Sequence, residues 1–333
     1  MKYLLLLLIS SLFFACAEDD TAQNSSENTE QDIATATVYS EATYDVIVEE
    51  DVIYAQCLSH ESWNSDQSEV IDLKLDVYKP DNIIANKPAI VHIHGGGFVG
   101  GDKQYEPIPY LGNYFARRGW VFFSLNYRLQ SDYGTIPQEW VDVGNLMEES
   151  PDQFLAIYPA QRDCKAALRW VFANALDYQV DTSQVSLSGG SAGAVTAVNL
   201  GISTAADYTN ELSIEEDETL DTVNIDQSYQ VQAIVDFWGS GVAVGAINQI
   251  YDVDRYHDQM PPLMIVHGTE DETVPYSSAI ELKNIYETQG VDYEFYPLEG
   301  RGHGPWGATY NDLGLQELMF NFLVEQQGLN LAD

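Results

Sequence analysis

The chain has 333 residues, which is enough for one large folded domain or two smaller ones, and its 45% hydrophobic and 12% aromatic residues indicate a globular protein. Only 14 Lys and Arg residues stand against 52 Asp and Glu residues, which gives a formal net charge of −38. Such a charge repels phosphate backbones and anionic head groups, so it disfavours binding to nucleic acid or to anionic membranes through charge.

The first sixteen residues predict an export signal rather than part of the fold. Lys2 supplies a positive start, and the apolar run that follows it is too short to span a bilayer as a mature helix. The run ends at Phe13-Phe14-Ala15-Cys16, which resembles the lipobox of bacterial lipoproteins. We therefore expect a signal peptide at residues 1–15, a lipid on Cys16, and anchoring of the chain to the bacterial outer membrane or cell surface.

The next segment predicts a linker between the lipid and a folded domain. Residues 16–43 contain no Lys or Arg and are rich in Ser, Thr, Asn, Gln and acidic residues, so we expect a flexible acidic tether followed by one domain at 44–333. Two further cysteines, Cys57 and Cys164, either form one disulfide in the exported chain or stay as unpaired, buried thiols. No His/Cys cluster indicates a metal site.

The order of the predicted elements indicates an α/β fold. An alternating strand at 71–78 is typical of a half-exposed edge strand, and the later strands are apolar runs of the buried, parallel kind. Strands and helices then alternate, which predicts a mostly parallel central sheet with helices on both faces. The expected strands are 71–78, 88–94, 120–126, a short one with Val185 and Leu187, 231–238, 263–266 and 292–296. The expected helices are 110–118, 159–174, one that starts at Ala192, 277–288 and 311–325.

Three stretches interrupt this alternation: residues 130–157, 203–230 and 240–260. The middle one carries seven acidic residues between Glu211 and Asp226 and no basic residue. Insertions at the carboxyl edge of a parallel sheet stand above its site, so 203–230 is either a lid over the active site or a solvated surface loop.

The clearest motif is Gly189-Gly190-Ser191-Ala192-Gly193, which has the G-x-S-x-G form of a nucleophile elbow. The serine of such an elbow sits on strained backbone between a strand and a helix, where a Cβ two residues before or after it would clash. The pentapeptide by itself also fits an ordinary tight turn between a strand and a helix. The choice between a nucleophile elbow and an ordinary turn depends on whether the chain also supplies an oxyanion hole, an acid and a base.

An oxyanion hole is predicted by His94-Gly95-Gly96-Gly97-Phe98, directly after the strand at 88–94. Glycines let the backbone approach a substrate closely, so the N–H groups of Gly96 and Gly97, with that of Ala192, are candidate donors to a developing oxyanion. The alternative for the glycine run is a flexible turn. Its position after a buried strand favours the catalytic interpretation.

A serine nucleophile needs a general base and an orienting acid. His303 is the candidate base, because it lies in a glycine-flanked loop between the last strand and the closing helix. The loop after the strand at 263–266 carries three candidate acids, Glu270, Asp271 and Glu272. With any of them, the chain order is serine, acid, histidine.

Together these motifs resemble the α/β-hydrolase carboxylesterases with an HGGG motif, which are related to hormone-sensitive lipase. The likeness is greatest to exported bacterial esterases, a branch that includes feruloyl and acetyl xylan esterases. The resemblance implies an α/β-hydrolase fold and favours Asp271 as the acid of a Ser191–Asp271–His303 triad. It rests on the segments 75–78, 94–98, 101–103, 126–129, 189–193, 267–275 and 302–304.

We therefore expect a serine carboxylesterase that hydrolyses short-acyl esters through an acyl-enzyme, without a metal or organic cofactor. From the resemblance and the export signal, acetyl or feruloyl esters of plant or algal polysaccharide are candidate substrates. A serine peptidase of the same fold is the first alternative, although such enzymes usually carry an additional large domain. A non-catalytic surface lipoprotein is the second, and the complete set of Ser191, Asp271 and His303 argues against it.

Overall fold

The computed structural model describes residues 36–333. The expected signal peptide, the lipid site at Cys16 and most of the expected tether lie outside the described residues. The described part begins earlier than predicted, however. Strand β1 (Thr37–Tyr39) pairs in parallel with β12 (Asn330–Ala332), and Val38 is fully buried. The tether boundary at residue 43 is therefore wrong, because a strand that pairs with the C-terminal segment belongs to the folded domain.

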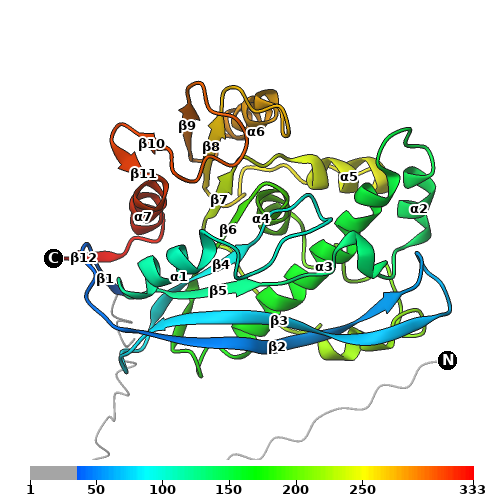
Figure 1. Cartoon of the computed structure of the whole chain (residues 1–333), viewed down its shortest axis with the longest axis horizontal. Helices are drawn as coiled ribbons and strands as arrows, with labels where there is room; N and C mark the ends of the chain where they lie inside the picture. Colours follow the sequence, from blue (N-terminus) through cyan, green and yellow to red (C-terminus); the bar gives the residue numbers. More distant parts are fainter. Residues whose placement is uncertain (1–35) are drawn as a thin grey trace, which may run out of the picture. The chain divides into compact units, whose positions relative to one another are not determined.

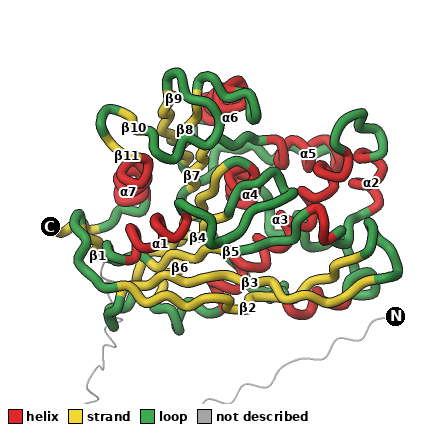
Figure 2. The backbone as a smooth tube through the Cα atoms, in the orientation of Figure 1, coloured by secondary structure: helices red, strands yellow, loops and turns green. Residues whose placement is uncertain are grey.

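An eight-stranded sheet forms the centre of this domain, in the order β2-β3-β5-β4-β6-β7-β8-β9 (Figures 1 and 2). Strand β3 runs antiparallel to both of its neighbours, and every other neighbouring pair is parallel. This confirms the predicted mostly parallel sheet. The strands are β2 (Val46–His60), β3 (Ser68–Pro80), β4 (Lys87–Ile93), β5 (Val121–Leu125), β6 (Val180–Gly190), β7 (Ile234–Phe237), β8 (Leu263–Gly268) and β9 (Tyr293–Leu298).

Helices cover both faces of the sheet, so alternate residues of its strands enter two separate cores. Ile90 and Phe122 pack with α1 and α7, whereas Val91 and Phe123 pack with α3, α4, α5 and α6. Strands buried on both faces explain the continuous apolar runs in the sequence. The helices are α1 (Ile108–Ala116), α2 (Gln138–Gly144), α3 (Pro151–Ala173), α4 (Ala192–Ile202), α5 (Val242–Tyr251), α6 (Tyr276–Gln289) and α7 (Leu315–Gln326).

Two element predictions need correction. The strand predicted at 71–78 is not the edge of the sheet, because β2 pairs along the whole of β3 and takes the edge position. The alternation of apolar and polar residues shows that one face of β3 is partly exposed, but it does not show where β3 lies in the sheet. The helix predicted from residue 159 begins eight residues earlier, at Pro151, and continues through Pro159. Pro151 holds the first position of this helix, where a proline is usual, and Pro159 lies in its interior.

Candidate active site

Ser191 occupies the turn between β6 and α4, and its backbone is strained. Its φ of 56° and ψ of −122° lie outside the regions that L-residues favour. Gly189 and Gly193 have to be glycines, because neighbouring backbone atoms lie where a Cβ would be. A Cβ on Gly189 would lie 2.3 Å from the carbonyl carbon of Gly193, and a Cβ on Gly193 would lie 2.0 Å from the oxygen of Ile93. Ser191 thus has the geometry of a nucleophile elbow, and the clash predicted on either side of it is confirmed.

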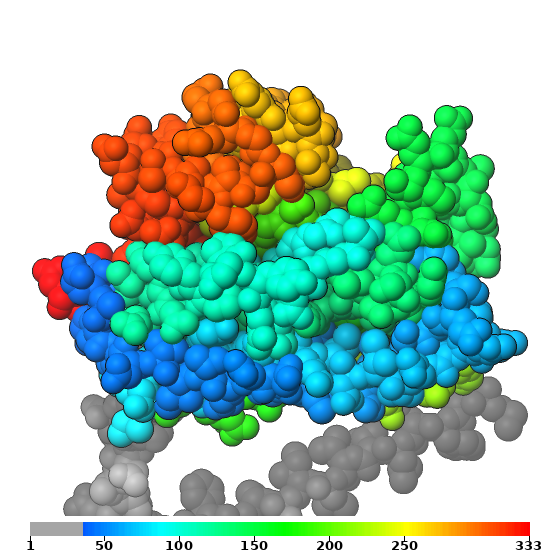
Figure 3. Space-filling view, in the orientation of Figure 1, coloured from blue at the N-terminus to red at the C-terminus, as the bar shows by residue number. Residues whose placement is uncertain are grey.

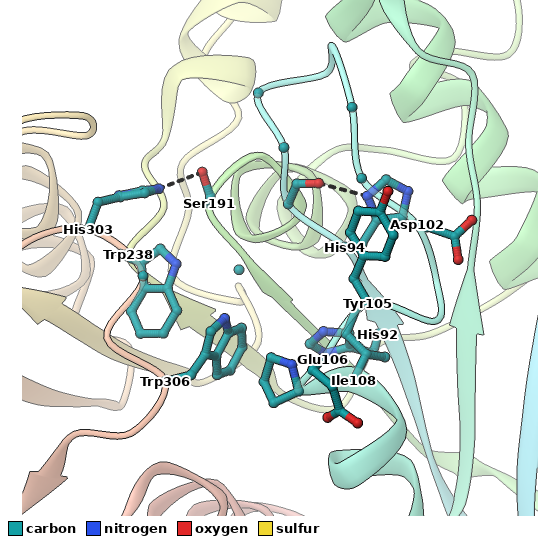
Figure 4. A pocket seen from close by; sticks show the side chains of 18 of the residues that line it. His92, His94, Asp102, Tyr105, Glu106, Ile108, Ser191, Trp238, His303 and Trp306 are labelled. Carbon is teal, nitrogen blue, oxygen red and sulfur yellow. Dashed lines mark hydrogen bonds between the residues drawn. The ribbon is translucent and has the colours of Figure 1, made fainter.

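The hydroxyl of Ser191 belongs to a chain of hydrogen bonds. Its Oγ lies 2.9 Å from His303 Nε2 (Figure 4). On the other side of the ring, His303 Nδ1 lies 2.7 Å from Asp271 Oδ2. Because a carboxylate only accepts, Nδ1 carries the imidazole proton and Nε2 is left to accept from the serine hydroxyl. The structure therefore brings together the three residues that the sequence selected from different loops.

Asp271 is buried and held by several donors. Its Oδ1 accepts the backbone N–H groups of Thr273 at 2.9 Å and Val274 at 3.0 Å. Burial opposes ionisation of this carboxyl group, but the bonds from His303, Val274 and Thr273 outweigh it and hold the pKa of Asp271 below its ordinary value. The rival acids Glu270 and Glu272 are exposed, and the carboxylate that pairs with His303 is that of Asp271.

A second histidine, His267, lies beside the carboxylate of Asp271. The Nε2 of His267 lies 2.9 Å from the carbonyl oxygen of Val274 and 3.4 Å from Asp271 Oδ2, so this nitrogen carries the proton. Burial lowers the pKa of His267, which favours the neutral imidazole beside the carboxylate.

The loops that carry Asp271 and His303 are fastened to each other. The N–H of Glu270 donates to the carbonyl oxygen of Arg301 at 2.9 Å, and the N–H of Gly300 donates to Thr269 Oγ1 at 2.9 Å. A Cβ on Gly268 would lie 2.3 Å from the Arg301 oxygen, so the two loops meet only because β8 ends in glycine. This contact fixes the separation of the acid and the histidine.

The glycine loop after β4 is held by two side chains. His94 stacks on Tyr127 with ring centroids 4.3 Å apart, and its Nδ1 lies 2.7 Å from the Gly95 oxygen. On the other side, Gln153 donates to the Gly97 oxygen at 2.8 Å. Sequence reasoning missed Gln153, because it lies in the stretch 130–157 that fits no alternation.

The three predicted oxyanion donors have free N–H groups. Within residues 36–333, no hydrogen-bond acceptor contacts the backbone N–H of Gly96, Gly97 or Ala192. Gly96 and Gly97 have φ values of 119° and 63°, which few other residues could adopt. Unpaired N–H groups beside a nucleophile are what an oxyanion hole requires.

A cavity of about 500 Å³, here called the serine cavity, opens beside these groups. Ser191, His303 and the glycine loop line its upper part, and aromatic, aliphatic and acidic side chains line the rest (Figure 4). Trp238 and Trp306 lie edge to face with centroids 4.7 Å apart. Across from them stand Tyr105 and the carboxylate of Glu106.

The acidic stretch 203–230 lines no part of the serine cavity, so the structure does not make it a lid there. Its Thr222 accepts a hydrogen bond from the N–H of Gln56 on the edge strand β2. Its Asp207 pairs with Arg255 at 2.8 Å, and its Asp217 faces Arg162 at 3.5 Å. The stretch is thus fastened to the body by several of its own acidic residues. One 3₁₀ turn, η2 (Glu218–Thr222), lies within it.

Other residues singled out in the sequence lie apart from the hydrogen-bonded chain. Cys57 and Cys164 are unpaired and buried, so the disulfide alternative is wrong. His92 is fully buried in β4, and its Nδ1 lies 2.8 Å from Ser188 Oγ. Asp163 lies inside α3 and forms a buried ion pair with Arg128.

The sequence matches the BD-FAE family over residues 75–148 and 153–249, just over half of the chain. The chain belongs to the BD-FAE family. The matched segments include the glycine loop and Ser191, whereas Asp271 and His303 lie beyond them.

Curated relatives of this BD-FAE protein include two from Mycobacterium tuberculosis. The probable carboxylic ester hydrolase LipM is 28% identical over 193 residues, which cover 57% of this chain and 35% of LipM. Esterase LipC is 26% identical over 252 residues, which cover 69% of this chain and 56% of LipC. The chain therefore spans only about a third to just over a half of the length of these relatives.

Solved structures similar to this BD-FAE protein share its fold. Esterase 2 of the planctomycete Thermogutta terrifontis, with propionate bound, has a TM-score of 0.58 and 26% identity, and the match covers 84% of this chain and 94% of that one. A truncated carbohydrate esterase from gut microbiota has a TM-score of 0.59 at 21% identity, covering 87% and 99%. The α/β-hydrolase fold implied by the motifs is confirmed.

Proposed function

We propose that this BD-FAE protein is a serine carboxylesterase with Ser191 as nucleophile, His303 as general base and Asp271 as orienting acid. The observation that carries the proposal is the hydrogen-bonded chain from Ser191 Oγ through the imidazole of His303 to Asp271. The strained elbow supports it, because strain at a non-glycine residue persists where the fold fixes a functional group. The named esterases among the relatives support the reaction class.

In the first half-reaction, Ser191 Oγ attacks the ester carbonyl carbon while its proton passes to His303 Nε2. The negative charge that develops on the carbonyl oxygen is stabilised by the N–H groups of Gly96, Gly97 and Ala192. Asp271 stabilises the imidazolium through Nδ1–H and stays ionised. The bond to the alcohol oxygen then breaks, and that oxygen takes the proton from Nε2.

In the second half-reaction, a water molecule gives a proton to His303 Nε2 as its oxygen attacks the acyl carbon. The tetrahedral intermediate collapses, the acyl–Oγ bond breaks, and Ser191 regains its proton from the imidazolium. The products are a carboxylic acid and the free enzyme. The same three N–H groups serve both half-reactions, because both place charge on the same oxygen.

Short-acyl esters are the substrate class that we propose. The similar esterase 2 of Thermogutta terrifontis has structures with propionate and with butyrate bound, which supports short acyl groups. Acetyl or feruloyl esters of plant or algal polysaccharide remain the specific candidates, on the strength of the resemblance and the export signal. A screen of p-nitrophenyl acetate, acetyl-xylan and methyl ferulate separates these possibilities.

The direct test compares p-nitrophenyl acetate hydrolysis by the native protein and by Ser191→Ala. We expect turnover by the native protein and a loss of about 10⁶-fold in kcat for the variant, because no other group can replace the nucleophile. Equal turnover by the two proteins, or none by the native protein, would overturn the proposal.

We further propose that the protein is exported and anchored by a lipid on Cys16, in a position from which it meets extracellular esters. Only the sequence of residues 1–16 supports this. None of the helices found within residues 36–333 is long and apolar enough to cross a membrane. Labelling with a radioactive fatty acid tests the proposal: native protein should take up the label and Cys16→Ser should not.

A further inference from the structure

His92 lines the serine cavity, and one of its ring nitrogens has no partner. The imidazole is fully buried, and no hydrogen-bond partner contacts its Nε2 within residues 36–333. The proposed two-step reaction does not use this nitrogen. A buried polar atom without a partner costs stability, so a protein rarely keeps one unless it serves another purpose. Pairing with a group that enters the cavity is such a purpose.

The position of His92 sets how far such a group extends from the nucleophile. His92 lies opposite Ser188 in the parallel register of β4 and β6, and Ser188 is three residues before Ser191. Three residues of a strand span about 10 Å. Figure 4 accordingly shows His92 well below Ser191 in the view. On the surface, the walls of the cavity come from the cyan segment around residue 100 and the orange segment around residue 300 (Figure 3).

The hydrogen bond to Ser188 fixes which ring nitrogen of His92 carries the proton. Burial lowers the pKa of His92 to about 3, so the ring is neutral and has one N–H group. Nδ1 lies 2.8 Å from Ser188 Oγ, and within residues 36–333 this hydroxyl has no other hydrogen-bond partner. The hydroxyl therefore donates to Nδ1, because its proton has no other acceptor. Nε2 then carries the imidazole proton and is a donor without an acceptor.

The charge of the cavity restricts which acceptor can pair with Nε2–H. The lining contains two carboxylates, those of Asp102 and Glu106, and no Lys or Arg. An anionic group would be desolvated there without a positive partner, which is unfavourable. A neutral oxygen, such as that of a ketone, ether or hydroxyl group, meets no such penalty. An alkyl group in the same place would leave Nε2–H unpaired.

Trp306 is the side chain that can admit the acceptor. The ring of His92 has no exposed surface, so a ligand oxygen reaches Nε2 only if a neighbouring group moves. Phe122 stacks on His92 with centroids 5.5 Å apart and is itself fully buried. The ring of Trp306 lies 6.4 Å from the imidazole, is only partly buried and lines the cavity. A small shift of this indole opens the path from the cavity to Nε2.

We propose that His92 is a specificity-determining residue, which donates its Nε2–H to a neutral oxygen of the ester substrate about 10 Å from Ser191. The proposal rests on the proposed esterase function and adds the chemical class of substituent that the site selects. Either the acyl or the alcohol part of the ester carries that oxygen.

A double variant removes the donor and keeps the packing. His92→Phe retains a flat ring against Phe122, and Ser188→Ala removes the hydroxyl that would otherwise lose its acceptor. The matched control is His257→Phe, because His257 is exposed and does not line the serine cavity.

The experiment measures kcat/KM for two pairs of esters in which a ketone oxygen replaces a methyl group. The acyl arm compares methyl 6-oxoheptanoate with methyl 6-methylheptanoate, and the alcohol arm compares 4-oxopentyl acetate with 4-methylpentyl acetate. In each ketone, five bonds separate the keto carbon from the ester carbonyl carbon, so with a hydrogen bond of about 3 Å the group spans roughly 10 Å.

We expect the ratio of ketone ester to methyl ester to fall about 10-fold or more in the double variant, in at least one arm, because the oxygen loses its donor. In His257→Phe both ratios should stay at the native value. Both esters of a pair meet the same nucleophile, so the ratio cancels any general loss of activity. A fall in the acyl arm assigns the oxygen to the acyl part, and a fall in the alcohol arm assigns it to the alcohol part.

The proposal is overturned if neither ratio falls, or if His257→Phe shows the same fall as the double variant. These outcomes leave the esterase function standing, because the esters are still hydrolysed. Absence of turnover of p-nitrophenyl acetate by the native protein would instead overturn the esterase function.

A second measurement decides if the double variant does not fold. Ser191→Ala protein labelled with ¹⁵N-histidine should bind the same esters without turnover. The Nε2–H proton of His92 should move downfield in the presence of the ketone ester of at least one pair, and not with its methyl partner. An equal response to the two partners, or no response to either, overturns the proposal.

Discussion

Gly193 packs against Ile93 so closely that a Cβ atom on Gly193 would lie 2.0 Å from the carbonyl oxygen of Ile93. Backbone atoms on both sides make this contact, so neither can yield as a flexible side chain would. It joins the first turn of α4 to the end of β4, where the glycine loop begins. The elbow and the proposed oxyanion loop are therefore held at a fixed separation.

From this contact we predict that Gly193→Ala lowers the free energy of unfolding by about 1–3 kcal/mol, the usual range for an overpacked site. We also expect the variant to lose most of its esterase activity. Thermal and urea unfolding measure the first effect, and p-nitrophenyl acetate hydrolysis measures the second. Gly245→Ala is the stability control, because its added Cβ meets open space within a helix. A Gly193→Ala protein as stable and as active as the native one would contradict this account.

The neighbouring acids allow a sharp test of the proposed triad. Asp271→Asn should lower kcat by about 10⁴-fold, because a neutral amide stabilises an imidazolium far less than a carboxylate does, and because its NH2 group can donate to Nδ1 and favour the wrong tautomer of His303. Glu270→Gln and Glu272→Gln should stay close to native, since both side chains are exposed. The assignment of Asp271 fails if either glutamine variant loses more activity than Asp271→Asn.

The sequence predicted the loops that meet at Ser191 because parallel strands all end at one edge of their sheet. It could not separate Asp271 from Glu270 and Glu272 on residue type alone. That choice depends on which carboxylate turns inward to the amides of Thr273 and Val274, which only the folded loop decides.

The same limit applies to elements that depend on distant partners. The pairing of β1 with β12 joins residues almost 300 positions apart, and three residues carry too little local pattern to predict it. The buried pair of Asp163 and Arg128 likewise joins residues 35 positions apart, and no local pattern indicates it. Local patterns identified the long buried strands, whereas these features rest on tertiary contacts.

The pair of Arg128 and Asp163 gives a prediction for stability. Their side chains approach to 2.6 Å and are almost entirely buried. Asp163→Ala should lower the free energy of unfolding by about 3–5 kcal/mol, because it leaves the guanidinium buried without a counter-charge. Urea unfolding measures the loss. In the exposed pair of Lys283 and Glu287, Glu287→Ala should change little. Equal effects in the two pairs would contradict the prediction.

Asp236 on β7 gives a prediction for the pH dependence of stability. It is fully buried, its Oδ1 accepts from the N–H of Gly239 at 2.6 Å, and its Oδ2 has no partner within residues 36–333. Burial raises the pKa of Asp236 to about 7. Since its ordinary pKa is about 3.9, the folded state binds a proton that the unfolded state releases, and this carboxyl group costs stability as the pH rises from about 4 to 7.

Asp236→Asn keeps an acceptor for Gly239 and removes the titration. The unfolding free energy of the variant minus that of the native protein should therefore rise between pH 4 and pH 7, by at most about 1.4 kcal/mol per pH unit, and level off above pH 7. Urea unfolding at pH 4.5, 6 and 8 measures this difference. A difference that is independent of pH, or that falls as the pH rises, would show that Asp236 is ionised throughout.

The central claim, that Ser191 is the nucleophile, is tested most directly by trapping the enzyme with an organophosphate. The similar Thermogutta terrifontis esterase 2 has a structure phosphorylated by paraoxon. Paraoxon should release about one equivalent of p-nitrophenol per active site as activity is lost, and peptide mass spectrometry should locate the diethylphosphoryl group on Ser191. Loss of activity with the group on another residue, or continued ester turnover by protein fully labelled at Ser191, would contradict the account.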